Sequence, residues 1–165
     1  MSFHNNYDQW RAMTKKENCP VCNQNPMPAG MEDIVELKYS WLSAEPIDCL
    51  RGACHLIAKQ HVIELYELDD SELLNFMKEV QLCSKALKLV TNAIKINYEI
   101  HGNSMPHLHV HLYPRYFDDP FPDQAINYKR KERLYTEKEY REFIEKMRKS
   151  VAENRGQFRV VQVSP

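Results

Sequence analysis

The sequence predicts an α+β domain built on an antiparallel sheet of about five strands with two main helices. Short segments rich in β-branched, aromatic and aliphatic residues follow one another in hairpin-like pairs bounded by turn formers. Two longer segments instead repeat apolar residues at helical spacing. Paired strands with separate helices are typical of α+β architecture. With 165 residues, of which 43% are hydrophobic and 27% charged, the chain has the size of one such domain.

Five segments have the composition of strands. Two precede the first helix, two follow it and are joined by the turn HGNSMP, and one closes the chain. These segments are residues 33–42, 54–62, 93–100, 107–113 and 157–163. Residues 116–133 read as a loop whose charged side chains are expected to be solvated.

Both helices carry an N-terminal capping signature. Asp69 is followed three residues later by Glu72, and Thr136 by Glu139, a pattern in which each side chain caps the backbone N–H of the other residue. Apolar residues then recur at helical spacing, which predicts a long amphipathic helix within 68–92 and a C-terminal helix over about 136–154. Gly156 stands where the second helix is expected to stop.

Composition narrows the class of protein. Because 22 basic and 23 acidic residues leave a net charge of −1, neither nucleic acid nor a membrane is an expected partner. The N-terminal segment has neither the basic nor the apolar stretch of a secretion signal, so we expect a cytoplasmic protein. The 5 cysteines lack framework spacing and are expected to be reduced. Residues 1–18 read as a polar N-terminal extension and 19–165 as a single domain.

The segment HLHVHLYPR places His107, His109 and His111 at alternate positions with aliphatic residues between them. In a strand, the three imidazoles share one face while the aliphatic side chains face the core. Three interpretations follow. The face could be partly solvated, the three rings could bind a catalytic metal as H-x-H pairs on strands do, or one imidazole could be a nucleophile.

The third interpretation gives the middle histidine a distinct role. A neutral imidazole can attack phosphorus and leaves readily from a phosphoramidate, so it divides hydrolysis of a phosphoanhydride into two easier steps. Hydrogen-bond donors would neutralise charge on the phosphoryl oxygens. On this chemistry His109 is the natural nucleophile, because it alone has a histidine on each side.

This motif, with GNSMP just before it, resembles the signature of the histidine triad (HIT) superfamily, His-φ-His-φ-His-φ-φ. The segment RGACHLIAKQHV similarly resembles the family's Gly-His-aliphatic-Pro-Lys-x-His strand, and the resemblance covers residues 19 to about 115. It implies a HIT-like fold, a homodimer, a nucleotide substrate, and attack on the α-phosphate through a nucleotidyl-histidine intermediate.

The resemblance also implies roles for individual residues. His109 corresponds to the nucleophile, and His111 to the histidine that contacts the phosphate or orients the nucleophile. Asn103 and Ser104 fall at positions that contact the phosphate or the bridging atom of the leaving group. Asn97 lies near the family's upstream asparagine, one residue out of register.

Some positions depart from the family pattern. Ala53 stands where a histidine often follows the glycine, and Ala58 where proline is usual. His55 lies two positions from the first of these sites, and we expect it to be structural. The tryptophan-rich C-terminal segment of some phosphoramidase members is absent, so residues 116–165 do not indicate a substrate.

The pair CPVC, Cys19 and Cys22, has the spacing of a metal knuckle or a redox pair. The absence of a strand before it and of a helical pattern after it argues against a thioredoxin-like role. Branches of the superfamily with an N-terminal C-x-x-C, including bacterial HIT hydrolases, look as if they complete a zinc site with two histidines. The resemblance therefore implies one structural zinc per chain, bound by Cys19, Cys22, His61 and His107. An ordinary pair of reduced thiols is the alternative.

These expectations converge on a nucleotide hydrolase that cleaves nucleoside phosphoanhydrides or phosphoramidates, of the diadenosine polyphosphate type, at the α-phosphate. One alternative is a nucleotidyltransferase or phosphorylase of the same superfamily, in which another acceptor replaces water. The other is a non-catalytic, zinc-stabilised nucleotide-binding module, which would keep the metal ligands without needing His109.

Overall fold

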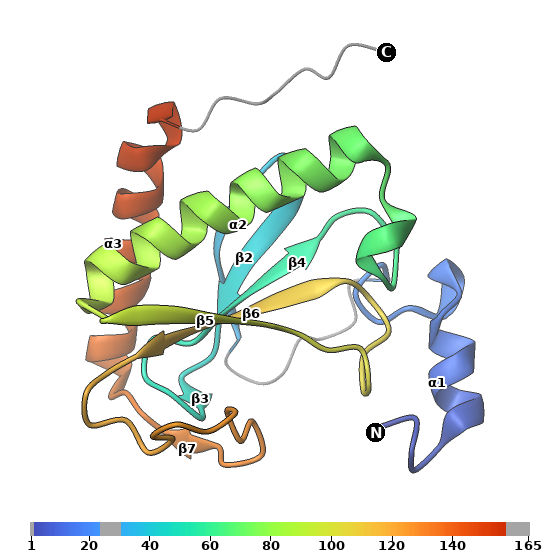
Figure 1. Ribbon diagram of the computed structural model, residues 1–165, viewed down its shortest axis with the longest axis horizontal. Helices are drawn as coiled ribbons and strands as arrows, with labels where there is room; N and C mark the ends of the chain where they lie inside the picture. Colours follow the sequence, from blue (N-terminus) through green and yellow to red (C-terminus); the bar gives the residue numbers. More distant parts are fainter. Residues whose placement is uncertain (1, 24–30, 158–165) are drawn as a thin grey trace.

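A five-stranded antiparallel sheet with the strand order β1-β2-β4-β6-β5 forms the centre of the protein, which confirms the predicted α+β fold (Figure 1). The computed structural model describes residues 2–23 and 31–157. The strands of this sheet are β1 (Glu32–Glu36), β2 (Ser40–Ala44), β4 (Cys54–Ala58), β5 (Lys95–Ile100) and β6 (His109–Arg115). Because β5 is at one end of the strand order, it is an edge strand.

The two main helices begin where their capping boxes predict. Asp69 caps α2 (Asp70–Thr91) and Thr136 caps α3 (Glu137–Asn154), each through a reciprocal pair of hydrogen bonds with the glutamate three residues later. A shorter helix, α1, was not predicted. It spans Tyr7–Met13, within the segment set apart as a polar extension, and is capped by Asn6. The 3-10 helices are η1 (Lys16–Asn18), η2 (Leu65–Glu67) and η3 (Arg155–Gln157). Across residues 2–23 and 31–157, every helix is too short or too polar to cross a membrane.

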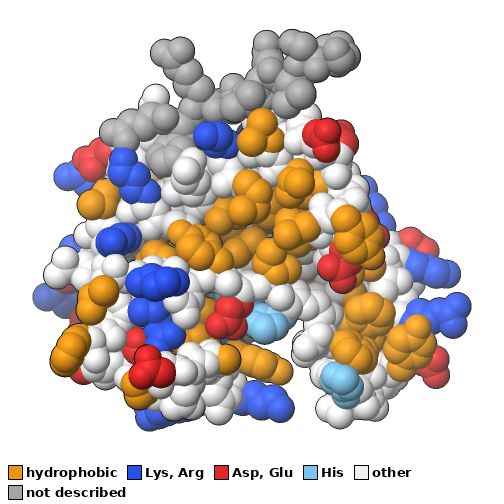
Figure 2. Space-filling view, in the orientation of Figure 1, with side chains coloured by type: hydrophobic (Ala, Val, Ile, Leu, Met, Phe, Trp, Pro, Cys, Tyr) orange, Lys and Arg blue, Asp and Glu red, His pale blue; other side chains and the backbone are white. Residues whose placement is uncertain are grey.

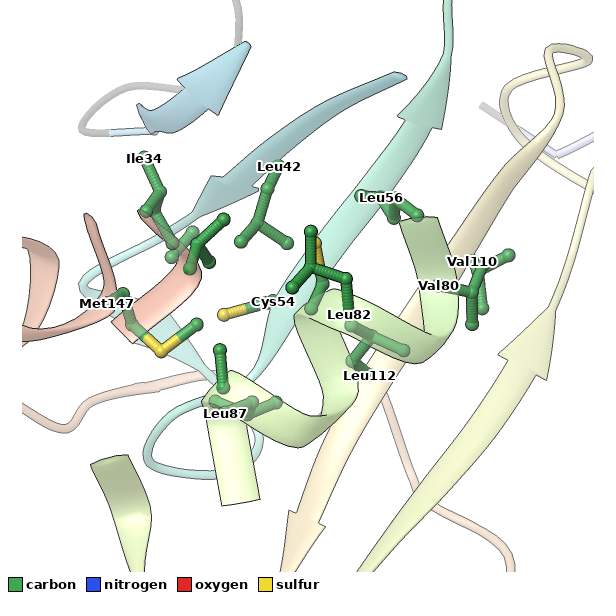
Figure 3. Close-up of a cluster of buried hydrophobic side chains, with 14 of the residues drawn as sticks. Ile34, Leu42, Cys54, Leu56, Val80, Leu82, Leu87, Val110, Leu112 and Met147 are labelled. Carbon is green, nitrogen blue, oxygen red and sulfur yellow. The ribbon is translucent and has the colours of Figure 1, made fainter. Parts of the chain in front are cut away.

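The main core lies between the sheet and the two long helices. Figure 1 shows α2 crossing one face of the sheet, with α3 beside it. In Figure 3, Leu56, Val110 and Leu112 from the strands meet Val80 and Leu87 from α2. Burying such a side chain contributes about 1.5–3 kcal/mol, and a slip of one residue would expose the whole set. Because strand residues alternate between faces, this burial directs His109 and His111 to the opposite side.

A second, smaller core covers part of that opposite side. It is formed by Cys49, Leu50, Ala53, Tyr113, Phe121 and Ile126. The segment 116–133 is therefore packed against the domain, and it ends in β7 (Glu132–Arg133), which pairs with β3 (Ile47–Asp48). The guanidinium of Arg115 donates to both carboxylate oxygens of Asp119, at 2.7 and 2.8 Å, and anchors the start of the segment.

The predicted strand 54–62 ends at Ala58 in β4, and the predicted strand 93–100 begins at Lys95 in β5. The other three predicted strands also differ from the structure. Residues 33–42 were predicted as one strand but lie in the hairpin of β1 and β2, whose turn is closed by a hydrogen bond from Leu37 N to Ser40 O at 2.9 Å. The triad strand begins at His109, because the backbone N–H of His107 donates to Met105 O at 2.9 Å and belongs to the preceding turn. Of the predicted strand 157–163, only Gln157 is among the described residues, and it lies in η3. The division into an extension and one domain stays a prediction.

Candidate active site

Two cysteines and two histidines from separate parts of the chain meet at one end of the sheet. Cys19 and Cys22 follow η1, His61 follows β4, and His107 precedes β6. One ligand atom from each of the four lies within 4.8 Å of all the others. The Sγ of Cys19 is 3.4 Å from Nδ1 of His107, and the Sγ of Cys22 is 3.2 Å from Nδ1 of His61. The four residues expected to bind a metal are therefore brought together.

Backbone carbonyls orient both imidazoles of this cluster. Nε2 of His61 donates to Thr14 O at 2.9 Å, and Nε2 of His107 donates to Ala58 O at 2.7 Å. Each Nδ1 therefore presents a lone pair to the two thiols, which is the arrangement that holds histidine ligands in metal sites. Burial, followed by the neighbouring Cys19, raises the pKa of Cys22 to about 11. Two thiolates this close need a cation, and two cysteines with two histidines are a zinc donor set.

His107 is thus separated from the other two members of the triad. His109 points to the opposite side, and its Nδ1 donates to the backbone carbonyl of His107 at 2.6 Å. That hydrogen bond leaves the lone pair on Nε2. Burial lowers the pKa of His109 below its usual value, so the ring is neutral at neutral pH. His109 therefore has the protonation state and tautomer that a nucleophile needs.

His111 is half-buried beside His109, with ring centroids 4.9 Å apart. The Tyr113 hydroxyl lies 3.2 Å from Nδ1 of His111, and the two rings stack with centroids 5.6 Å apart. Burial, followed by the neighbouring histidines, lowers the pKa of His111 to about 2. His111 is therefore a neutral ring whose orientation is fixed by the Tyr113 ring and its hydroxyl.

Two further histidines, which were not among the predicted site residues, flank His111. His55 on β4 pairs with it in register, and the two rings meet edge to face at 4.8 Å. Nε2 of His55 lies 3.6 Å from Oδ2 of the buried Asp48, and burial lowers the pKa of His55 to about 4. On the other side, the ring of His101 lies 5.4 Å from that of His111. The structure thus places His55, which we expected to be structural, beside His111, and its role stays a prediction.

Two cavities meet at His109 and His111. The smaller, about 210 Å³, is lined by the turn residues 101–105 and by Tyr128. The larger, about 300 Å³, has an apolar lining that includes Val21, Met31 and Ile57. In Figure 2, a hollow with a histidine at its edge opens on this face of the molecule. A substrate could therefore place one part in each cavity with its reacting centre at His109.

The predicted phosphate-binding residues are divided between two places. Asn103 and Ser104 line the smaller cavity. Asn97 lies on β5, where its side-chain oxygen accepts a hydrogen bond from Nζ of Lys95 at 2.9 Å, and it lines neither cavity. Among the described residues, Tyr128 and Lys131 of the 116–133 segment also reach the larger cavity, so this segment forms part of its wall.

The N-terminal segment holds the turn that carries Asn103. The backbone N–H of Phe3 donates to Asn103 O at 2.8 Å, and Nε1 of Trp10 donates to Gly102 O at 2.7 Å. The same segment supplies Thr14 to the cysteine and histidine cluster. Residues 2–18 therefore support both the cluster and the cavity.

Comparison with known proteins agrees with this geometry. Residues 44–118 match the HIT domain family. A HIT-like protein of Methanocaldococcus jannaschii is 32% identical over 105 residues, which cover 61% of this chain and 79% of that protein. Adenosine 5'-monophosphoramidase of Saccharomyces cerevisiae is 30% identical over 83 residues, which span 50% of this chain and about half, 52%, of the yeast protein.

Structural comparison leads to the same family. The crystal structure of a histidine triad protein from Sinorhizobium meliloti superposes with a TM-score of 0.65 at 26% identity, covering 73% of this chain and 90% of that one. Together with the matched residues and the arrangement of His109 and His111, these likenesses show that the chain belongs to the histidine triad family.

Proposed function

We propose that this protein is a nucleotide hydrolase that cleaves nucleoside phosphoanhydrides or phosphoramidates at the α-phosphate through a nucleotidyl intermediate on His109. The observation that carries the proposal is the hydrogen bond from Nδ1 of His109 to the His107 carbonyl, which leaves Nε2 as the nucleophilic atom in the wall of both cavities. The likeness to an adenosine 5'-monophosphoramidase supports the same substrate class.

The reaction would proceed in two steps. His109 attacks the α-phosphorus and the leaving group departs, and water then releases the nucleoside monophosphate and restores the imidazole. His111 would contact the phosphoryl group, and Asn103 and Ser104 would donate hydrogen bonds to its oxygens or to the bridging atom. A role for Asn97 in phosphate binding stays a prediction. Its side chain accepts a hydrogen bond from Lys95 outside both cavities. If phosphate or another acceptor replaces water in the second step, the same intermediate yields a transferase.

A structural zinc is the second part of the proposal. Cys19, Cys22, His61 and His107 would hold one zinc ion per chain, and the carbonyl hydrogen bonds of both histidines fit that role. Four protein ligands close the coordination shell, so bound zinc would supply stability and not an activated water. Its contribution to the reaction would be to fix His107, whose carbonyl orients His109.

We also propose a homodimer, as the family resemblance implies. Strand β5 is an edge strand, and such edges readily pair with another chain. Met77 of α2 and Tyr98 and Ile100 of β5 are large hydrophobic side chains that remain exposed. Figure 2 shows hydrophobic side chains gathered at the centre of this face, over α2 and β5. A second copy could cover this surface and continue the sheet.

A substrate panel tests the proposed activity. The wild-type protein should release a nucleoside monophosphate from adenosine phosphoramidate, a dinucleoside polyphosphate or a nucleotide sugar. His109→Ala should abolish release while metal analysis still finds about one zinc per chain, since the ligands are untouched. Absence of turnover on every substrate, or full activity in His109→Ala, would contradict the proposal. Product analysis with added phosphate separates hydrolysis from transfer.

A further inference from the structure

A carboxylate and histidine pair stands beside the proposed nucleophile but outside the triad. Glu99 lies on β5 directly opposite His111 in the strand register, and His101 follows two residues later. Nε2 of His101 is 2.9 Å from Oε2 of Glu99. Because a carboxylate only accepts, Nε2 carries the hydrogen, and Nδ1 is the atom that can exchange a proton.

The surroundings of this pair suit proton transfer. The His101 ring lies 5.4 Å from the His111 ring and 5.9 Å from the Tyr128 ring, and it lines the smaller cavity together with His109. The Glu99 side chain is 20% exposed and that of His101 37%, so the pair is sheltered while the imidazole still reaches solvent. A carboxylate in this position orients the ring and stabilises the imidazolium that forms when Nδ1 takes a proton.

The cavity that His101 lines is the one suited to the leaving group. It is the smaller of the two and is lined by Asn103, which is expected to contact the phosphate or the bridging atom of the leaving group, whereas Ser104 lines both cavities. The larger cavity has the apolar lining that a nucleoside prefers. With His109 between them, attack on the α-phosphorus would drive the departing group toward His101.

We propose that His101, oriented by Glu99, is the general acid that protonates the leaving group and then the general base that activates water. This inference rests on the proposed function and deepens it. It assigns the site to substrates whose leaving group is strongly basic, the nucleoside phosphoramidates of amines, because such a group cannot depart as an anion.

Protons and electron pairs balance over the two steps of the reaction. Nε2 of His109 forms a bond to phosphorus as the phosphorus–nitrogen bond of the substrate breaks, and the electron pair passes to the amine nitrogen. That nitrogen takes the proton from Nδ1 of His101, which enters the step as the imidazolium with its Nε2 hydrogen held by Glu99, and the neutral amine leaves. Water then attacks phosphorus and gives its proton to Nδ1 of His101. The bond to His109 breaks with its electron pair returning to Nε2, which releases the nucleoside monophosphate and restores both histidines.

Two substrates with the same nucleotide test the proposal. One is the AMP phosphoramidate of an alkylamine, whose leaving group needs a proton, and the other is the p-nitrophenyl ester of AMP, whose leaving group departs unaided. The kcat/KM value reports the first step for both. General acid catalysis supplies about 100-fold or more, so His101→Gln should lower kcat/KM by at least about 100-fold for the phosphoramidate and by less than about threefold for the ester.

Two variants complete the experiment. Glu99→Gln keeps a hydrogen-bonding partner for His101 but removes the charge, and should show the same selective loss with a smaller amplitude. Glu153→Gln changes an exposed carboxylate on α3, away from the site, and should match the wild type on both substrates. Thermal unfolding of each variant checks that the fold is intact.

The outcomes are distinct. Selective loss on the phosphoramidate supports the role of His101 as an acid. An equal loss on both substrates, or no loss on either, overturns it while leaving the proposed function in place. Failure of the wild-type protein to cleave either compound would instead contradict the proposed function and this inference with it.

Discussion

The hydroxyl of Tyr113 offers a direct way to test how His111 is held. In Tyr113→Phe the ring remains, so its stacking on His111 at 5.6 Å is kept. Only the oxygen that lies 3.2 Å from Nδ1 of His111 is removed. The substitution therefore removes the hydrogen bond to the proposed phosphate-binding histidine, together with the contact of the same hydroxyl with the Cys49 thiol.

The expected loss of kcat follows from the strength of the hydrogen bond that Tyr113→Phe removes. A hydrogen bond between neutral groups contributes about 1 kcal/mol net, which corresponds to roughly a fivefold change in rate if the bond is needed in the transition state. We expect Tyr113→Phe to lower kcat by that factor on adenosine phosphoramidate. Tyr116→Phe is the matched control, because the Tyr116 hydroxyl donates to Arg51 O at 2.8 Å, away from the two histidines.

A double-mutant cycle decides whether the hydroxyl acts through His111. If it does, Tyr113→Phe should have little further effect once His111 is replaced by asparagine. Additive losses, or an equal loss in Tyr116→Phe, would refute the reasoning. A fall in thermal stability that accounts for the lost activity would refute it as well.

Three further predictions concern the metal, pH and the backbone. Cys22→Ser should lose the bound zinc that mass spectrometry under native conditions measures, whereas Cys83→Ala should keep it. Equal zinc content in the two variants would argue against the metal site. Because burial lowers the pKa of His55 from 6.5 to about 4, the free energy of unfolding should fall as pH drops from about 6.5 toward 4, by up to ~1.4 kcal/mol per pH unit. A His55→Gln variant should show a flatter dependence, and parallel curves would contradict the assignment. A Cβ on Gly52, at φ +89°, would lie 2.8 Å from a side-chain carbon of α2. Gly52→Ala should therefore lower the free energy of unfolding measured by calorimetry by about 1–3 kcal/mol. Gly156→Ala should not lower it, because a Cβ there would have no neighbour within 4 Å.

The elements that could be predicted from the sequence have strong local signals. Asp69 and Thr136 cap helices through partners only three residues away, so their signature is contained in a few positions. The hairpin of β1 and β2 was missed because its turn, residues 37–39, contains none of the usual turn formers. Helix α1 was missed because it buries no residue, and long-range hydrogen bonds such as that of Trp10 tie its segment to the domain.

The residue pattern of a single strand does not predict which residues of other strands lie beside it in the candidate site. Alternation within residues 107–113 predicted the face that His109 and His111 share, but it could not predict which residues lie across from them. The register of β4 and β5 places His55 and Glu99 on either side of His111, and register depends on packing across the whole sheet. The metal cluster likewise joins Cys19 to a histidine 88 residues later, and only the family resemblance indicated that pairing.

The most direct test of the account is to identify the residue that carries the nucleotide during turnover. Wild-type protein mixed with adenosine phosphoramidate, quenched rapidly and digested, should give a peptide that bears AMP on His109, and the adduct should disappear as substrate is consumed. His109→Ala should give no adduct while keeping its zinc. An adduct on another residue, or turnover by His109→Ala, would contradict the assignment of His109 as the nucleophile.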